Sequence, residues 1–192
     1  MMVKLVKPVP RDIICDPASG TSGFLVAAAE YLQDRHKDLF LDDGLKDHFN
    51  NKMFYGNDSE VTMQRIGAMN LLLHGIENPN LTGIDSLSDT NSGNRGRYTL
   101  VLANPPFKGS LDYPSVSKDL LRTVKTKKTE LLFLALFIGM LKPGGRCACI
   151  VPNGVLFGPD ECERKTGEAR IRLKYVWVFH FCSKSVINIF EI

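Results

Sequence analysis

The sequence predicts an α/β fold in which a mostly parallel, twisted sheet carries helices on both faces. Short apolar runs typical of buried strands alternate along the chain with longer segments rich in helix-forming residues. The run Asp12–Cys15 leads through a glycine-rich turn into the helix-like run Phe24–Leu32, and Tyr98–Ala103 is a further strand-like run of apolar and β-branched residues. The 192 residues, 44% of them apolar and 23% charged, suit one domain with a sizeable core.

The N-terminal part predicts an extended approach, a strand and a helix. Pro8-Val9-Pro10 fixes an extended approach to the first strand, Ile13-Ile14-Cys15, which an Asp-Pro pair closes. Thr21 or Ser22 can cap the following helix, which contains consecutive alanines. The stretch after it, Gln33–Asp47, is charged and is expected to be solvated.

A second strand and helix follow. Lys52–Gly56 predicts the strand, Asn57-Asp58 stands at its end, and Glu60–His74 predicts the helix. The residues from Asn80 to Ile84 predict a third strand with Asp85 at its tip. Acidic residues are therefore expected at the carboxyl ends of the second and third strands.

The next elements alternate in the same way. Thr90–Arg97 is rich in Asn, Gly and Ser and predicts a surface loop before the fourth strand, Tyr98–Ala103. Glu130–Met140 predicts a helix that stops near Pro143-Gly144-Gly145, and Arg146–Pro152 predicts a fifth strand.

A polar stretch, residues 108–129, separates the fourth strand from that helix. Its cations are Lys118, Arg122, Lys125, Lys127 and Lys128. Two interpretations stay open: the stretch folds over a neighbouring site and contacts phosphates, or it is a solvated loop.

Two loops are placed where α/β proteins bind ligands. Asp16–Phe24 (DPASGTSGF) follows the first strand, and its glycines and the helix N-terminus after it can approach a nucleotide-like cofactor. Asn104-Pro105-Pro106-Phe107 follows the fourth strand. Because the carboxyl ends of parallel strands meet at one rim of the sheet, the two loops predict a donor site beside an acceptor site.

Together these motifs resemble those of the adenine-specific DNA methyltransferases, and within them the modification subunit of type I restriction-modification systems. That family has a DPxxGTxGF loop followed by an NPPF loop. The segments Arg65–Ile76 (RIGAMNLLLHGI), Leu141–Arg146 (LKPGGR) and Val151–Phe157 (VPNGVLF) also look like this subfamily. The resemblance covers about residues 3–158.

The resemblance implies a Rossmann-like, S-adenosylmethionine-dependent methyltransferase fold with S-adenosylmethionine as the cofactor. Asp16 would face the amino-acid end of the cofactor, Asp58 would accept hydrogen bonds from its ribose, and Asp85 would lie near its adenine. The expected cofactor-binding residues are Asp16, Ala18, Gly20, Thr21, Gly23, Phe24, Asp58 and Asp85.

The implied reaction is methyl transfer to the exocyclic amino group of adenine in DNA. Because the lone pair of that nitrogen is delocalised into the ring, two acceptors for its hydrogens would draw it toward tetrahedral geometry. The Asn104 side-chain oxygen and the Pro105 carbonyl are the implied acceptors, Pro106 stiffens the loop, and Phe107 would stack on a flipped base. This chemistry needs no metal.

Plain structural interpretations stand beside these roles. Asp58 could cap the next helix together with Ser59, and Asp85 could be a turn or cap residue. Residues 104–107 could be a stiff Asn-Pro turn followed by a core phenylalanine. That turn alone does not explain why NPPF follows a strand downstream of DPASGTSGF, which favours the functional interpretation.

Composition limits the remaining possibilities. The 5 cysteines, an odd number without a CxxC pair, indicate buried reduced thiols and no zinc site. The N-terminus lacks a signal-peptide core, and the longest apolar run, Leu131–Leu141, is shorter than the roughly 20 residues that span a bilayer. We therefore expect a cytoplasmic protein with no membrane partner.

The formal net charge of +3 is too small to indicate nucleic-acid binding by itself. The resemblance implies that a separate specificity subunit reads the DNA and that a restriction subunit joins the complex. DNA and these two subunits are the expected partners.

The chain also departs from the family pattern. Family members commonly have glycine where Ser22 stands; a serine is plausible at this position but could crowd the cofactor's approach. Residues 1–158 are expected to form the catalytic core, without the aromatic-containing motif and the helical domain that normally precede it. Residues 159–192 form a divergent tail, for which a truncated or frame-shifted reading frame is one explanation, and Tyr175–Phe181 within it is a β-rich run.

Two other functions remain open from the sequence. One is a catalytically incomplete fragment of such a subunit, which keeps the fold but methylates nothing. The other is a methyltransferase that uses the same NPP loop on RNA or on protein glutamine.

Overall fold

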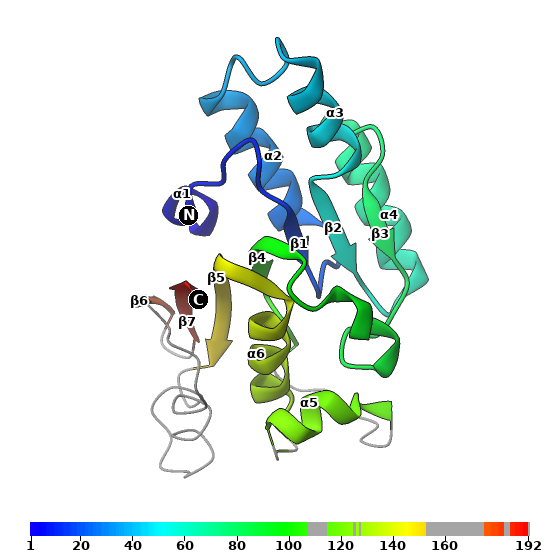
Figure 1. The fold of residues 1–192 in the computed structure, drawn as a ribbon, viewed down its shortest axis with the longest axis vertical. Helices are drawn as coiled ribbons and strands as arrows, with labels where there is room; N and C mark the ends of the chain where they lie inside the picture. Colours follow the sequence, from blue (N-terminus) through cyan, green and yellow to red (C-terminus); the bar gives the residue numbers. More distant parts are fainter. Residues whose placement is uncertain (107–114, 125, 127, 153–174, 183–184, 192) are drawn as a thin grey trace.

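The structure is a computed structural model that describes residues 1–106, 115–124, 126, 128–152, 175–182 and 185–191 (Figure 1). Strands and helices alternate in it as the sequence predicts. In chain order they are α1 (Met2–Val6), β1 (Ile14–Asp16), α2 (Gly23–Arg35), α3 (Asp43–Asn51), β2 (Phe54–Asn57), α4 (Val61–Leu73), β3 (Asn80–Thr82), the 3-10 helix η1 (Asp89–Asn94), β4 (Tyr98–Ala103), α5 (Lys118–Thr123), α6 (Thr129–Met140), β5 (Leu141–Pro152), β6 (Tyr175–Cys182) and β7 (Ser185–Glu191).

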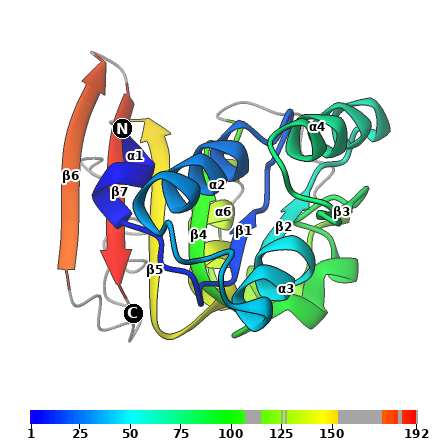
Figure 2. The ribbon, with the colours of Figure 1, turned by 90° about the horizontal axis from the view of Figure 1, so that it is seen from above.

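The described strands form a single sheet in the order β3-β2-β1-β4-β5-β7-β6. The first five in this order pair in parallel, while β7 is antiparallel to β5 and β6 is antiparallel to β7 (Figure 2). The central strand β1 pairs with β2 through Ile14 and Phe54, and with β4 through Ile14 and Leu100. The prediction of a mostly parallel sheet is confirmed.

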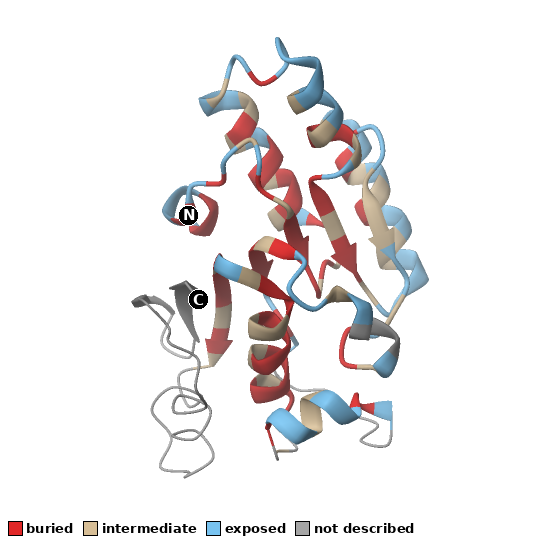
Figure 3. Ribbon diagram, in the orientation of Figure 1, coloured by how far each residue is buried: buried red, intermediate tan, exposed pale blue. Residues whose placement is uncertain are grey.

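Alternate residues of the strands pack on opposite faces of the sheet, as the two-residue period of a strand requires. Ile14, Leu100 and Leu102 belong to one buried cluster, which also contains residues of α1, α2, α3 and α4. Cys15 and Val101 belong to the other, with Leu132, Phe133, Leu136 and Phe137 of α6. Helices therefore cover both faces, and α6 is buried almost along its length (Figure 3).

The chain begins with a helix that the sequence analysis did not predict. In α1 the side chains of Met2, Val3 and Val6 are buried in the cluster that contains α2. The helix ends at Lys7, which has a left-handed φ of 48° and donates its N–H to the carbonyl of Val3. Five residues are too few to show a helical period, so the sequence pattern does not indicate this helix.

The stretch Gln33–Asp47 is solvated as expected except at Leu39. Leu39 is completely buried, and α3 begins at Asp43 inside the stretch. The Asp42 carboxylate starts α3 by accepting hydrogen bonds from the N–H groups of Gly44 and Leu45. Residues 41–47 are exposed apart from half-buried Leu45, so the prediction of a solvated charged segment is confirmed there, although the helix α3 itself was not predicted.

Strand β5 starts at Leu141 rather than at Arg146. Tyr98 pairs with Leu141 and Leu100 pairs with Arg146, so the residues between Leu141 and Arg146 bulge out of the ladder. Gly144 supplies the left-handed φ of 78° that this bulge contains. The Pro-Gly-Gly segment, near which the helix was expected to stop, therefore lies within β5, and the helix α6 already ends at Met140.

The predicted β-rich run near the C-terminus is β6, and a second strand, β7, follows it. Through β7 this part of the chain extends the same sheet beside β5. Residues 153–174, where the expected boundary at 158 falls, lie outside the described residues. No helix in the described part of the chain is long and apolar enough to cross a membrane.

The thiols of Cys15, Cys147 and Cys149 are free and completely buried, as the cysteine count predicts. Burial raises the pKa of the Cys15 thiol well above its usual value, so the group stays neutral inside the sheet. Cys162 and the side chain of Cys182 are outside the described set.

Candidate functional site

A large cavity of about 770 Å³ opens between the Asp16–Phe24 loop, α1 and α2. Its size is typical of small-molecule sites. It is lined by Met1, Met2, Val3, Lys4, Asp16, Ala18, Ser19, Gly20, Thr21, Gly23, Phe24, Ala27, Glu30, Tyr31, Asp34, Arg35 and Asn104. The structure therefore brings Asn104 of the second predicted loop to the same cavity as the first loop.

A second, smaller cavity of about 340 Å³ also borders the loop, through Pro17 and Ala18. It is lined by Pro17, Ala18, Asn57, Asp58, Ser59, Ile84, Asp85, Ser86, Leu87, Pro106, Ser115, Thr129 and Phe133. Ala18 lines both cavities, so a long ligand could occupy both by crossing the loop at this residue.

The predicted site residues divide between the two cavities. Asp16, Gly20, Thr21, Gly23, Phe24 and Asn104 line only the large one, and Asp58, Asp85 and Pro106 line only the small one. Pro105 is buried and lines neither of them. Phe107 lies outside the described residues.

Asp16 combines deep burial with access to the large cavity. Its side chain is at the end of β1, the residue is 1% exposed, and its Oδ1 accepts a hydrogen bond of 3.0 Å from the N–H of Ala18. Burial raises the pKa of Asp16 to about 7; the Ala18 N–H opposes this shift, and the nearby charge of Asp58 adds to it. A cation in the cavity would be the natural partner of this carboxylate.

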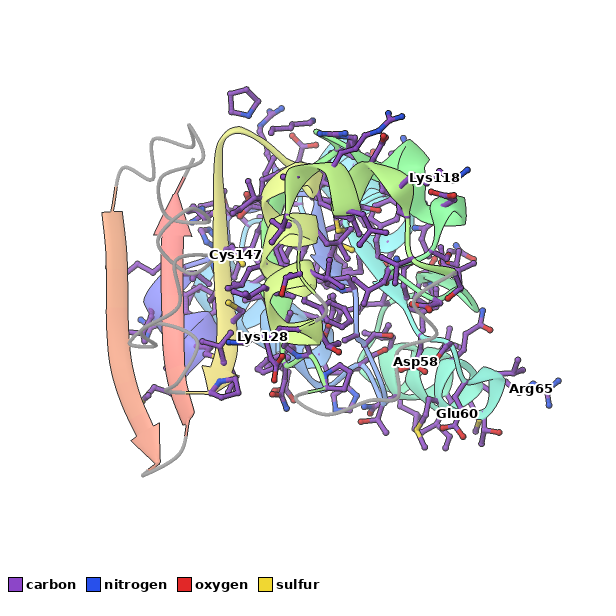
Figure 4. The ribbon with its side chains drawn as sticks, turned by 90° about the horizontal axis from the view of Figure 1, so that it is seen from below. Asp58, Glu60, Arg65, Lys118, Lys128 and Cys147 are labelled. Atoms are coloured by element: carbon purple, nitrogen blue, oxygen red, sulfur yellow. The ribbon has the colours of Figure 1, made fainter. Side chains whose placement is uncertain are left out.

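Asp58 holds the glycine-rich loop in place. Gly20, at a left-handed φ of 49°, donates its N–H to Oδ2 of Asp58 at 2.9 Å. Oδ1 accepts the N–H of Glu60 at 2.8 Å, and Figure 4 shows Asp58 and Glu60 together where α4 begins. Helix α4 has Glu60 at its N-cap position without a side-chain cap, so neither Asp58 nor Ser59 is the cap residue.

Asp58 keeps acceptor capacity for a ligand. Its residue is half-buried, and an ionised carboxylate can accept about four hydrogen bonds. Asp85 is exposed and its Oδ1 accepts the N–H of Leu87 at 2.9 Å, which is the turn geometry that the sequence left as an alternative. Both acids line the small cavity.

A polar network that the sequence analysis did not predict holds the Asp16–Phe24 loop in place. Thr82 donates to Oδ1 of Asn57, and Nδ2 of Asn57 donates to the Ser86 hydroxyl. Ser86 then donates to the carbonyl of Pro17 at 2.6 Å, and the backbone N–H of Ser19 donates to the carbonyl of Asn57. The available signal was Asn57, a polar residue at the end of the buried strand β2.

Ser22 lies away from both cavities, so it does not crowd a ligand in either of them. The residue is completely buried and lines neither cavity. Its side chain lies against α4, where a methyl group added at Gly67 would be 2.5 Å from the Ser22 hydroxyl oxygen. Ser22 is at the N-cap of α2 with φ 61°, and its hydroxyl makes no cap bond and has no hydrogen-bond partner.

We expect Ser22→Gly to raise the free energy of unfolding by about 1–3 kcal/mol, because it removes a left-handed strain and an unsatisfied buried hydroxyl. For a chain of this size the melting temperature should rise by roughly 2–4 °C per kcal/mol. Ser59→Gly, at an exposed serine without positive φ, is the control and should be neutral or slightly destabilising. Equal melting temperatures for wild type and Ser22→Gly would contradict this interpretation.

The structure describes only part of the cationic stretch, residues 108–129, that follows the Asn104–Phe107 loop. Lys118 and Arg122 are exposed on α5, where Arg122 and Arg95 each lie 3.7 Å from the Asp119 carboxylate. Lys118 begins α5, whereas Lys128 is the N-cap residue of α6, and Figure 4 shows the two side chains well apart. Lys125 and Lys127 lie outside the described residues, and contact of this stretch with phosphates stays a prediction.

Comparisons with known proteins agree on one family. The sequence model of the N-6 DNA Methylase family matches residues 1–176. The chain is 36% identical over 161 residues to the type I restriction enzyme StySPI methylase subunit of Salmonella potsdam, and the match covers 81% of this chain and 30% of that protein. It is 35% identical over 161 residues to the EcoKI methylase subunit of Escherichia coli K12, with the same coverage of 81% and 30%.

A solved structure shows the same fold. The EcoKI M protein superposes with a TM-score of 0.80 at 27% identity, and the match covers 98% of this chain and 41% of that one. The predicted Rossmann-like methyltransferase fold is therefore confirmed. The chain spans about 30% of the length of the StySPI and EcoKI subunits. By its sequence and its fold, this chain belongs to the N-6 DNA Methylase family.

Proposed function

We propose that the chain binds S-adenosylmethionine and transfers its methyl group to the exocyclic amino group of adenine in DNA, as part of the modification subunit of a type I restriction-modification system. The observation that carries the proposal is that Asn104 lines the same cavity as Asp16 and the glycine-rich loop. The family and the names of its similar members, which are methylase subunits of type I enzymes, support it.

The residues around the two cavities fit this cofactor. Its amino-acid end carries an ammonium group, and the buried Asp16 carboxylate in the large cavity is a matching anion. Its ribose has hydroxyl donors, and Asp58 offers acceptor oxygens in the small cavity. Ala18, which lines both cavities, is where the ligand would cross the loop.

When bound, the cofactor supplies a methyl group made electrophilic by a sulfonium. The chain's contribution is to position the acceptor and to stabilise charge on it. The exposed Asn104 at the end of β4 can accept one hydrogen of the amino group through its side-chain oxygen. The Pro105 carbonyl is the proposed second acceptor, and the prolines hold the loop rigid so that little reorganisation is needed.

Other chains complete the proposed function. A specificity subunit would read the DNA sequence and a restriction subunit would join the complex, in the cytoplasm where the DNA lies. The small net charge of +3 fits this division, because most sequence-reading contacts would come from the specificity subunit.

The first test is calorimetric binding of S-adenosylmethionine to the purified chain. We expect binding in the micromolar range, about 8 kcal/mol, and at least a tenfold loss of affinity in Asp58→Ala. The loss is expected because the variant removes both the ribose acceptor and the hydrogen bond that holds Gly20. Asp38→Ala, which removes an exposed carboxylate that lines neither cavity, is the control and should bind as wild type does.

A folded chain that binds no cofactor would contradict the proposal. A second measurement then identifies the acceptor, using transfer of a labelled methyl group to DNA, RNA and protein in parallel. Label in DNA at adenine supports the proposed function, whereas label only in RNA or in glutamine would replace it with the alternative acceptors.

A further inference from the structure

We infer that Arg146, on β5, is a positioning residue for the cofactor site, because it fixes α1 as one wall of the large cavity. The inference rests on the proposed binding of S-adenosylmethionine. Arg146 itself lines neither cavity, so it would act through α1 and not by touching the ligand.

The Arg146 guanidinium joins three parts of the N-terminal segment. Nη1 donates to the carbonyl of Val6, the last residue of α1, at 2.5 Å. It also donates to the carbonyl of Lys7, the C-cap residue of α1, at 3.2 Å. Nη2 donates to Oδ2 of Asp12 at 2.6 Å. A planar guanidinium can serve the helix end and a carboxylate at once, which a lysine ammonium on a flexible chain does less well.

Asp12 is itself held firmly, so it can serve as the anchor. Its side chain is 6% exposed, and that of Arg146 is 27% exposed. Oδ2 of Asp12 also accepts the N–H of Val9 at 2.8 Å, and Oδ1 accepts the hydroxyl of Thr99 on β4 at 2.7 Å. The pair thus connects the chain between α1 and β1 to two neighbouring strands of the sheet.

The helix that this pair holds is part of the cavity. Met1, Met2, Val3 and Lys4 line the large cavity together with Asp16 and Phe24. Figure 2 shows α1 beside α2 and above β5 and β7. With only five residues, α1 cannot hold a helical conformation alone, so its position depends on burial of Met2, Val3 and Val6 and on these hydrogen bonds at its end.

The two cavities allow a selective test. In the proposed orientation the amino-acid end of the cofactor lies in the large cavity and the adenosine lies in the small one. S-Adenosylhomocysteine carries both parts, whereas 5′-methylthioadenosine lacks the amino-acid end. If Arg146 acts through α1, its loss should lower the affinity for S-adenosylhomocysteine and leave the affinity for 5′-methylthioadenosine unchanged. A general loss of folded structure would lower both affinities.

The experiment compares calorimetric affinities of both ligands for wild type, Arg146→Lys and Arg146→Met, with Arg11→Met as a control for removal of an exposed charge beside Asp12. We expect about a tenfold loss of affinity for S-adenosylhomocysteine in Arg146→Met, a smaller loss in Arg146→Lys, and less than about a twofold change for 5′-methylthioadenosine. Arg11→Met should bind both ligands as wild type does.

Arg146→Met leaves the Asp12 carboxylate buried without its cation and can fail to fold, so Arg146→Lys, which keeps a positive charge, makes the test decisive. Equal affinity changes for the two ligands in Arg146→Lys, or no change for either, would overturn the inference. Failure of the wild-type chain to bind S-adenosylhomocysteine would instead overturn the proposed function.

Discussion

Substitution of Asn104 by alanine is expected to lower the rate of methyl transfer to DNA by roughly 10²–10³-fold, the usual cost of removing one preorganised group that stabilises transition-state charge. The side chain is exposed at the end of β4, so its loss should change the free energy of unfolding by less than about 0.5 kcal/mol. The measurement is single-turnover transfer of a labelled methyl group with the specificity subunit and its target DNA present.

Asn104→Asp is the informative companion variant. A carboxylate keeps an acceptor oxygen at the same position, so this variant should retain much more activity than Asn104→Ala. Cofactor affinity should stay within about threefold of wild type in both, since the proposed role is toward the acceptor base. An alanine variant with a near-wild-type rate would show that Asn104 is not the acceptor of the amino hydrogen.

The sequence predicted best those parts of the fold that are encoded locally. Strand β4 was predicted with its observed bounds because Tyr98–Ala103 is an uninterrupted apolar and β-branched run. The rim position of Asp16 and Asn104 also followed, because each stands at the end of a parallel strand. In these cases residues within about ten positions of each other determine the result.

The parts that could not be predicted depend on contacts between distant segments. The Arg146–Asp12 ion pair joins residues 134 positions apart, and nothing near Arg146 in the sequence indicates that it meets the end of α1. The conformation of Ser22 was missed because its left-handed φ is imposed by the loop around it, while its residue type suggested an ordinary helix cap. The division of the site into two cavities likewise depends on packing of α1 and α6 around the loops.

The second large effect is expected at Asp16, where the variant Asp16→Asn should stabilise the chain at alkaline pH. The pKa of Asp16 is about 7 in the folded chain and close to 3.8 in a model peptide. At pH values between about 4 and about 7, the Asp16 carboxyl therefore keeps its proton in the folded state but has lost it in the unfolded state. The free energy of unfolding of the wild type consequently falls as the pH rises through this range. The amide carries no charge and escapes this cost, which is on the order of 2–4 kcal/mol above pH 7.

Denaturant unfolding of both proteins between pH 4 and pH 8 measures this difference. The two should be nearly equal in stability at pH 4, and Asp16→Asn should be the more stable protein at pH 8. Its amide oxygen can still accept the Ala18 N–H, so the hydrogen bond of the wild-type carboxylate is preserved. A variant that is less stable at every pH would show that the charged carboxylate is required by the fold itself.

The same substitution should lower the affinity for S-adenosylmethionine by about tenfold or more, since the ammonium of the ligand loses its anionic partner. In wild type the ligand's positive charge favours the ionised carboxylate, so binding near pH 6 should release a proton, seen as a binding enthalpy that depends on the buffer. Asp16→Asn should lose this buffer dependence. Burial of the ionised Asp16 carboxylate lowers the stability of the chain without ligand, because water is excluded around it. The same exclusion of water strengthens the interaction of this carboxylate with a cationic ligand.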